Sequence, residues 1–115
     1  MREGGLLKWQ WSLYGEGHRA RVNLLVHALT VPLFLAGNVA LLLAPVLGAK
    51  AALGALAMVL AVAAQGKGHR LEATAPVPFS GPGDVVARLL LEQWITFPRF
   101  VLSGGFARAW RDAGR

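Results

Sequence analysis

The chain has 115 residues, of which 55% are hydrophobic, and a formal net charge of +6. This apolar share exceeds the roughly 45–50% of soluble domains, and with a mean hydropathy of +0.47 it favours a membrane protein. Because the chain has no cysteine, disulfides, thiolate ligands and iron–sulfur clusters are excluded, so any metal must be bound by nitrogen and oxygen.

The basic residues are distributed in a way that indicates membrane topology. Eleven of the twelve Lys and Arg residues lie before Val22 or after Gly66, and only Lys50 lies between them. By the positive-inside rule, both termini are expected in the cytoplasm and the turn near Lys50 outside. No groove-reading or aromatic-interleaved motif supports nucleic acid as a partner. We therefore expect an integral membrane protein, in a bacterial inner membrane.

The sequence predicts an all-α fold in a single membrane domain, built on a helical hairpin of two transmembrane helices. Each span needs about 20 residues at about 1.5 Å per residue, and the nearly uncharged stretch is long enough for two. The second span is rich in Ala and Gly, which permits close helix approach. In chain order we expect an interfacial segment at 1–21, transmembrane helices at 22–44 and 46–65, a polar loop at 66–83, an amphipathic helix at 84–97 and a basic, aromatic tail at 98–115.

The helix predicted at 84–97 carries charges that argue against a third crossing. Asp84 follows a Pro- and Gly-rich loop and is placed to cap the helix. Arg88 and Glu92 have the i, i+4 spacing of a surface ion pair, and Gln93 adds a further polar group. We therefore expect this helix to lie at the membrane interface.

All three histidines lie at one end of the predicted hairpin. An antiparallel pair of spans places His27 level with His69 and Glu72, a set that suits non-haem Fe(II) with positions open for O2 and substrate. In a straight helix His18 would lie about 13 Å along the axis from His27 and on the opposite face. It can join the other ligands only if the chain bends near Gly17.

The neighbouring polar residues have simpler interpretations as well. His27 alone fits an interhelical hydrogen bond, Glu72 alone fits a surface ion pair, and Tyr14 alone fits an aromatic belt. The gathering of every histidine at one end favours a metal site, since ionisable residues at membrane depth are functional candidates. The residues expected to orient the ligands are Tyr14, Asn23 and Gln65.

These residues resemble the membrane 2-hydroxy fatty acid dioxygenases, a family called Mpo-like and long catalogued as a domain of unknown function. Its first signature is Tyr-x3-His-x4-Asn-x3-His with a Pro five residues on, and its second is Gln-x2-Gly-His with a downstream Glu and Pro. The matching residues are Tyr14, His18, Asn23, His27 and Pro32, then Gln65, Gly68, His69, Glu72 and Pro76.

The resemblance implies an all-helical membrane enzyme that binds Fe(II) through His18, His27 and His69. With O2 it would remove one carbon from a 2-hydroxy fatty acid as CO2. The fatty acid would lie with its tail in the bilayer and its carboxylate at the cytoplasmic interface, near basic side chains. The basic residues at that end are Arg19, Arg21 and Arg70.

Two other classes of function stay open at this point. One is a haem-binding electron carrier, with His27 and His69 as axial ligands between the two spans. The other is a noncatalytic membrane scaffold whose histidines serve only helix contacts. The sequence leaves the chain length of the substrate, the identity of the metal and the formation of a homo-oligomer open.

Overall fold

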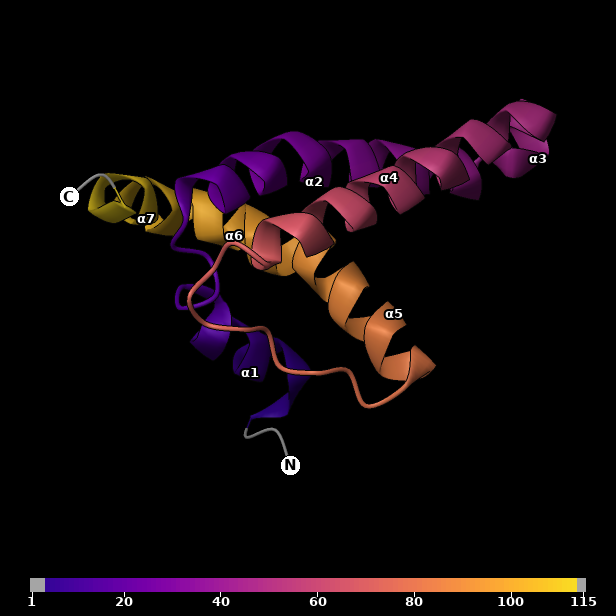
Figure 1. Ribbon diagram of the computed structural model, residues 1–115. Helices are drawn as coiled ribbons and strands as arrows, with labels where there is room; N and C mark the ends of the chain where they lie inside the picture. The colour runs from indigo at the N-terminus through magenta and orange to yellow at the C-terminus, as the bar shows by residue number, and fades with distance from the viewer. Residues whose placement is uncertain (1–3, 114–115) are drawn as a thin grey trace.

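The computed structural model describes residues 4–113, and this part of the chain is helical without any strand (Figure 1). The outermost residues of the predicted 1–21 segment and of the 98–115 tail lie outside the described residues. The prediction of an all-α fold is confirmed. In order, the elements are α1 (Gly5–Tyr14), α2 (Arg21–Leu42), α3 (Ala44–Leu47), the 3-10 turn η1 (Gly48–Lys50), α4 (Ala51–His69), α5 (Pro82–Leu91), the π-helical η2 (Glu92–Thr96), α6 (Phe97–Leu102) and α7 (Gly105–Ala113).

Helices α2 and α4 form an antiparallel hairpin whose backbones touch (Figure 1). A Cβ atom built on Gly37 would lie 2.5 Å from the carbonyl oxygen of Gly54, and one built on Gly54 would lie 2.5 Å from that of Gly37. Only glycine therefore fits at this crossing point. Such close contact stabilises a helix pair by van der Waals packing even where lipid removes the hydrophobic drive to associate.

The two hairpin arms have the length and composition of membrane spans. Arg21–Leu42 and Ala44–His69 are long and apolar enough to cross a membrane, and only 28% and 17% of their most apolar stretches are buried inside the protein. Large apolar side chains such as Leu29 and Leu53, both 68% exposed, therefore point away from the protein. This exposure is a hint of membrane association, because a helix in the core of a soluble protein would be mostly buried.

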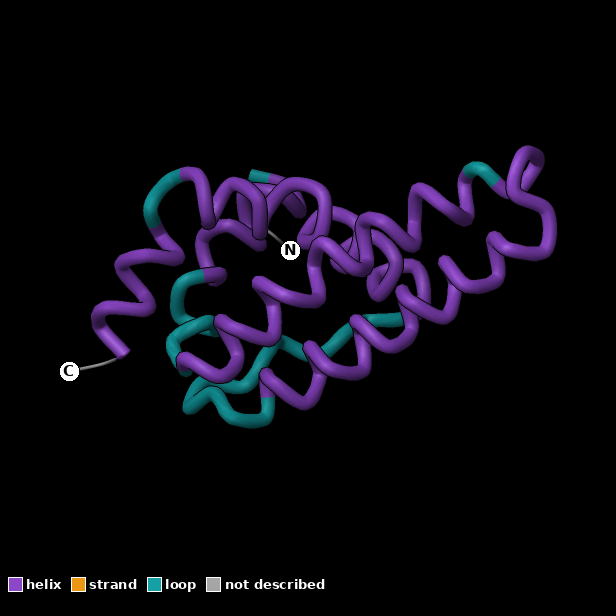
Figure 2. Tube along the Cα trace, turned by 90° about the horizontal axis from the view of Figure 1, so that it is seen from above, coloured by secondary structure: helices purple, strands orange, loops and turns teal. Residues whose placement is uncertain are grey.

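A second helical rod, α5–η2–α6, crosses the hairpin near its open end (Figures 1 and 2). It extends beyond the predicted 84–97 helix at both ends and runs past Pro98, because the change to π-helical spacing before Pro98 accommodates the missing N–H. Gln93 and Thr96 are fully buried. The rod thus packs on the rest of the protein at its middle, and the core formed there with α1 and α2 consists of Tyr14, Leu24, Val31, Phe97 and Phe100.

The ends of the hairpin differ from their predicted bounds in one respect that affects the site. Helix α4 persists through Gly66 and Gly68 to His69, so the connecting loop begins later than the predicted residue 66. A Cβ atom on Gly68 would lie 2.4 Å from the Asn23 side-chain oxygen, so this glycine allows α2 and α4 to stay in contact up to the last turn.

Replacing Gly54 by alanine is expected to push the hairpin apart and lower the free energy of unfolding by about 1–3 kcal/mol, because the added methyl overpacks the crossing. Gly66→Ala is the matched control on the same helix, since a Cβ there meets nothing within 4 Å. The control should be neutral or stabilising by about 0.5–1 kcal/mol. Chemical unfolding in detergent micelles, followed by circular dichroism, measures the free energy of unfolding of both variants. An equal change in Gly54→Ala and Gly66→Ala would contradict the close contact between the two helices.

Candidate metal centre

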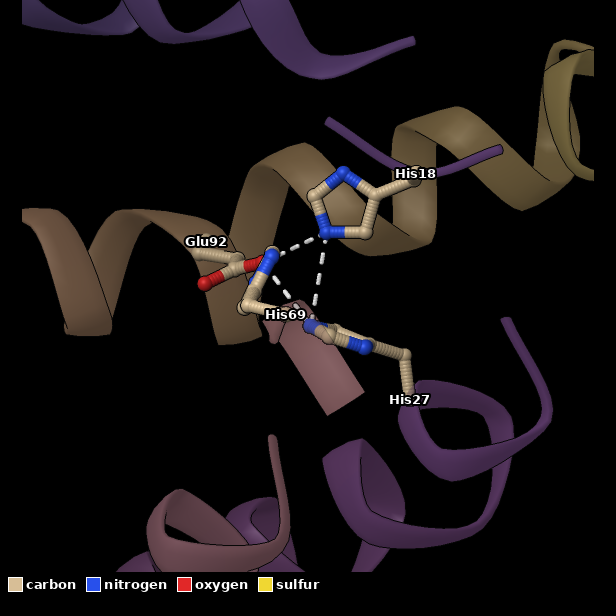
Figure 3. Close-up of side chains that lie close together, drawn as sticks. All are labelled: His18, His27, His69 and Glu92. Atoms are coloured by element: carbon tan, nitrogen blue, oxygen red, sulfur yellow. Dashed lines mark hydrogen bonds and ion pairs between the residues drawn. The ribbon is translucent and has the colours of Figure 1, made fainter. Parts of the chain in front are cut away.

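Four side chains from four separate segments converge at the open end of the hairpin (Figure 3). His18 lies between α1 and α2, His27 lies on α2, His69 ends α4, and Glu92 begins η2. One ligand atom from each lies within 4.8 Å of all the others. His18 and His27 are buried, at 4% and 0% exposure, whereas His69 and Glu92 are partly buried.

The bend that His18 requires is present. Helix α1 ends at Tyr14, and Ala20 is extended, with φ −79° and ψ 132°, before α2 begins. The chain therefore reverses within residues 15–20 instead of continuing as a straight helix. As a result the Nε2 atoms of His18 and His27 lie 3.4 Å apart.

Backbone carbonyl groups orient two of the imidazoles. Nδ1 of His18 lies 2.7 Å from the carbonyl oxygen of Tyr14, and Nδ1 of His27 lies 3.0 Å from that of Asn23. Because a carbonyl oxygen only accepts, each Nδ1 carries a proton, which leaves Nε2 of each ring facing inward. Metal-binding histidines are held in this way, with the second ring nitrogen donating to a carbonyl or carboxylate.

The inward-facing atoms of the group lie close to one another. Oε2 of Glu92 lies 3.5 Å from Nε2 of His18 and 3.4 Å from Nε2 of His27. Nδ1 of His69 is buried without a hydrogen-bond partner among the described residues. Three nitrogens and one carboxylate oxygen facing one point repel one another unless a cation or a proton lies among them. The set fits a metal ion such as Fe(II) or Zn(II), which imidazole and carboxylate ligands suit.

Tyr14 supports this group from the side of α1. Its ring stacks on His18, with ring centroids 3.8 Å apart, and its hydroxyl donates to Oε2 of Glu92 at 2.8 Å. Burial, followed by the adjacent charge of Glu92, raises the pKa of the Tyr14 hydroxyl, which therefore remains a donor. Burial acts to raise the pKa of Glu92, but hydrogen bonds from His18 and His27 hold it well below its ordinary value, so this residue is a carboxylate.

Glu72, the carboxylate ligand predicted from the sequence, lies outside the group of four side chains. Its two oxygens accept hydrogen bonds from the backbone N–H groups of Arg19 and Ala20 at 2.9–3.1 Å. A further bond of 2.7 Å comes from the side-chain amide of Asn23. These bonds satisfy N–H groups at the start of α2, which has no cap of its own. The carboxylate among the histidines is instead Glu92.

Glu92 is not among the site residues predicted from the sequence, because its i, i+4 spacing from Arg88 indicated a surface ion pair. The guanidinium of Arg88 instead lies 3.4 Å from Asp84, its i−4 neighbour. Asp84 lies in the first turn and accepts from the N–H of Ser80. The available signal was the adjacent Glu92 and Gln93 in an otherwise apolar run, which marks a polar face turned into the protein.

The other predicted site residues lie around the cluster. Gln65 is one helical turn away from His69 and exchanges two hydrogen bonds with Gln93, at 3.0 and 2.8 Å. Asn23 links Glu72 to His27 through its side chain and its carbonyl group. The remaining predicted site residues are basic and exposed, namely Arg19, Arg21 and Arg70.

The three arginines proposed to hold a carboxylate have different surroundings. The guanidinium of Arg21 stacks on Trp110 and donates to its carbonyl oxygen. Arg19 lines a cavity of about 650 Å³ beside Tyr14. Arg70 lies exposed just beyond α4. None of these arginines belongs to the group of four ligands.

Comparison with protein-family models, curated proteins and solved structures found no match to this chain. Fold and site together define an all-helical protein with two apolar helices long enough to span a membrane. Its group of three histidines and one carboxylate could hold a metal ion. The case for a function therefore depends on the geometry of this group.

Metal binding should depend on Glu92 far more than on Glu72. Glu92→Gln removes a charged ligand and is expected to weaken binding of Co(II) or Zn(II) by more than the roughly 10–100-fold that loss of an orienting partner costs. Glu72→Gln keeps an acceptor oxygen and should weaken binding by about tenfold at most. Metal analysis and competition titration of both variants, with His27→Ala as the ligand-loss reference, measure this. A larger loss in Glu72→Gln would return the ligand role to Glu72.

Glu72 is expected to act mainly on stability. Glu72→Ala leaves several N–H groups without their charged acceptor and should lower the free energy of unfolding by about 1–3 kcal/mol. Glu16→Ala, at an exposed carboxylate before the same bend, is the matched control and should stay within about 0.5 kcal/mol of the wild type. Urea titration of the metal-free proteins tests this, and equal stability of the two variants would contradict the capping role.

Proposed function

We propose that this protein is a membrane-embedded, Fe(II)-dependent dioxygenase that removes one carbon from 2-hydroxy fatty acids as CO2. The observation that carries the proposal is the convergence of three imidazoles and one carboxylate within 4.8 Å. A His-rich set with one carboxylate suits Fe(II) and leaves positions for O2 and substrate. The three histidines are those that the resemblance to the Mpo-like dioxygenases implies.

The position of the group at one end of the hairpin supports a lipid substrate. The hairpin arms are long and apolar enough to span a bilayer, and basic residues are concentrated beyond the end that holds the histidines. By the positive-inside rule this end lies at the cytoplasmic interface. A fatty acid whose tail is in the bilayer would present its carboxylate and 2-hydroxyl at that depth.

The reaction balances without an added reductant. One 2-hydroxy acid and one O2 give the acid shortened by one carbon, CO2 and water. The bond between C1 and C2 breaks, C1 leaves as CO2, and C2 is oxidised from an alcohol to a carboxylic acid while O2 is reduced. A bound Fe(II) would supply the redox-active centre that brings O2 and the 2-hydroxy acid together.

The protein groups prepare that centre before any substrate binds. The carbonyl groups of Tyr14 and Asn23 fix the orientation of His18 and His27. The Tyr14 hydroxyl holds one oxygen of Glu92. Burial of His18 and His27 excludes water from the inner side, so the partly exposed side with His69 and Glu92 is where substrate approaches.

The geometry does not favour haem. The ring centroids of His27 and His69 are 4.9 Å apart, and His18 lies within 4.8 Å of both. A porphyrin between His27 and His69 would need the space that the third imidazole and Glu92 occupy. A scaffold without a cofactor is the remaining alternative, and it predicts that purified protein retains no metal.

The proposed reaction can be tested directly. Protein in lipid nanodiscs is loaded with Fe(II) without oxygen, mixed with 2-hydroxypalmitate and exposed to air. We expect pentadecanoate and CO2 in equal amounts, and neither product from His69→Ala, which lacks one ligand. Palmitate, which lacks the 2-hydroxyl, should not be consumed. Iron-loaded wild-type protein that leaves 2-hydroxypalmitate unchanged would overturn the assignment.

A further inference from the structure

The closed end of the hairpin exposes a surface without a polar side chain. Figure 1 shows this end, with α3, at the far side of the molecule from α6 and α7. Residues 39–49, the hairpin tip, are apolar residues, glycine and proline only. Val46 is 82% exposed, Leu42 is 71% exposed and Leu43 is 47% exposed. An exposed apolar patch of this kind indicates a surface that contacts lipid or another protein.

The backbone of the tip satisfies its hydrogen bonds within the tip. The N–H groups of Leu43, Val46 and Leu47 donate to carbonyl groups of the tip at 2.9–3.0 Å, and Pro45 has no N–H to satisfy. Gly48 has a φ of +61°, which allows the chain to reverse between two short helical turns. In hydrocarbon every backbone polar group needs a partner inside the protein, whereas water can satisfy an open loop. The backbone of the tip therefore suits an apolar solvent.

The length of the hairpin allows the tip to reach the far boundary of the hydrocarbon but not to pass it. From Arg21 to Leu42, α2 extends about 32 Å, and the hydrocarbon region of a bilayer is about 30 Å thick. An average tilt of about 20° shortens this reach to about 30 Å. Lys50 directly precedes the segment from Ala51 to Lys67, which extends about 24 Å. Its backbone therefore stops short of the outer headgroups, which its long side chain can reach.

The composition of the tip favours lipid over a protein partner. Protein interfaces have a polar rim and about one hydrogen bond per 100–200 Å². No side chain of the tip can form such bonds, and Lys50 beside it is the nearest polar residue in the sequence on that side. The apolar surface also continues along the outer faces of both spans, where Leu29 and Leu53 are each 68% exposed. The same apolar solvent would therefore cover the spans and the tip.

We infer that the tip lies within the outer hydrocarbon layer of the bilayer, with Lys50 reaching the outer headgroups. The inference rests on the membrane-embedded position in the proposed function and goes beyond it. The sequence predicts that the turn near Lys50 lies outside the membrane. In the inferred arrangement the hairpin traverses the hydrocarbon without a loop in the water beyond it.

Spin labels on single cysteines measure the depth of the tip, because the chain has no cysteine of its own. Val46→Cys reports on the tip, and the high exposure of this position makes the substitution compatible with folding. Leu29→Cys, on the outer face of α2, is the matched control for hydrocarbon. Thr74→Cys, in the exposed loop after α4, is the control for water. In nanodiscs, relaxation of each label by O2, which dissolves in hydrocarbon, is compared with relaxation by a water-soluble nickel chelate.

We expect the label at residue 46 to behave like the label at residue 29, with strong relaxation by O2 and weak relaxation by the nickel chelate. Strong relaxation by the nickel chelate, as at residue 74, would place the tip in water and overturn the inference. Weak relaxation by both reagents would show that a second copy of the chain covers the tip, which would overturn the inference as well.

The reactivity of the same cysteines gives a second measurement without a spin label. A thiol reacts as its thiolate, and apolar surroundings raise the pKa of the thiol. We expect Val46→Cys in nanodiscs to react with a water-soluble maleimide at least about tenfold more slowly than Thr74→Cys, because a pKa raised by one lowers the thiolate fraction tenfold. The difference should disappear in denaturing detergent. Equal rates in nanodiscs would contradict the inferred position.

The controls separate this inference from the proposed function. If Leu29→Cys lies in hydrocarbon and Val46→Cys lies in water, only the position of the tip is wrong. If Leu29→Cys also lies in water, the membrane-embedded position in the proposed function is wrong. Formation of pentadecanoate tests the metal centre at the opposite end of the hairpin, so the reaction can fail while the position of the tip stands.

Discussion

The backbone contact between α2 and α4 is the constraint on which the site depends. At Gly37 and Gly54 the helices touch, and at the other end Gly68 admits the side chain of Asn23. Two helices in contact at both ends have one relative register. This register places His27 and His69 side by side, with ring centroids 4.9 Å apart. A bulkier residue at either end would separate the rings, because close packing leaves no space to absorb it.

Glu72 couples this hairpin to the third histidine. It lies three residues after His69, and it binds the N–H groups that directly follow His18. Through Asn23 it also reaches the backbone carbonyl that orients His27. The Glu72 carboxylate thus contacts the segments of all three histidines without belonging to the cluster. Glu72 can therefore match the signature in the sequence and still act by positioning the ligands.

Much of this arrangement could be predicted from the sequence, and the remainder could not for identifiable reasons. Hydropathy and charge distribution gave the hairpin, and an antiparallel pair of helices made the proximity of His27 and His69 a geometric necessity. The bend at His18 could be stated only as a requirement, since glycine permits a break but does not fix its direction. The place of Glu92 in the cluster could not be predicted, because the adjacent Glu92 and Gln93 indicate only a polar face, whereas the contact with the histidines depends on where the α5–η2–α6 rod crosses the hairpin.

The carbonyl contacts of His18 and His27 imply that a metal ion could bind without prior reorientation of these two rings. Neither contact involves a metal, and each leaves Nε2 of its ring facing the other members of the group. Nε2 of both rings and the Glu92 carboxylate lie 3.4–3.5 Å from one another, and a cation bound among them would compensate the charge of the carboxylate. The helices therefore supply the rigidity, and a bound ion would supply the positive charge, so that metal binding would require little rearrangement of the chain.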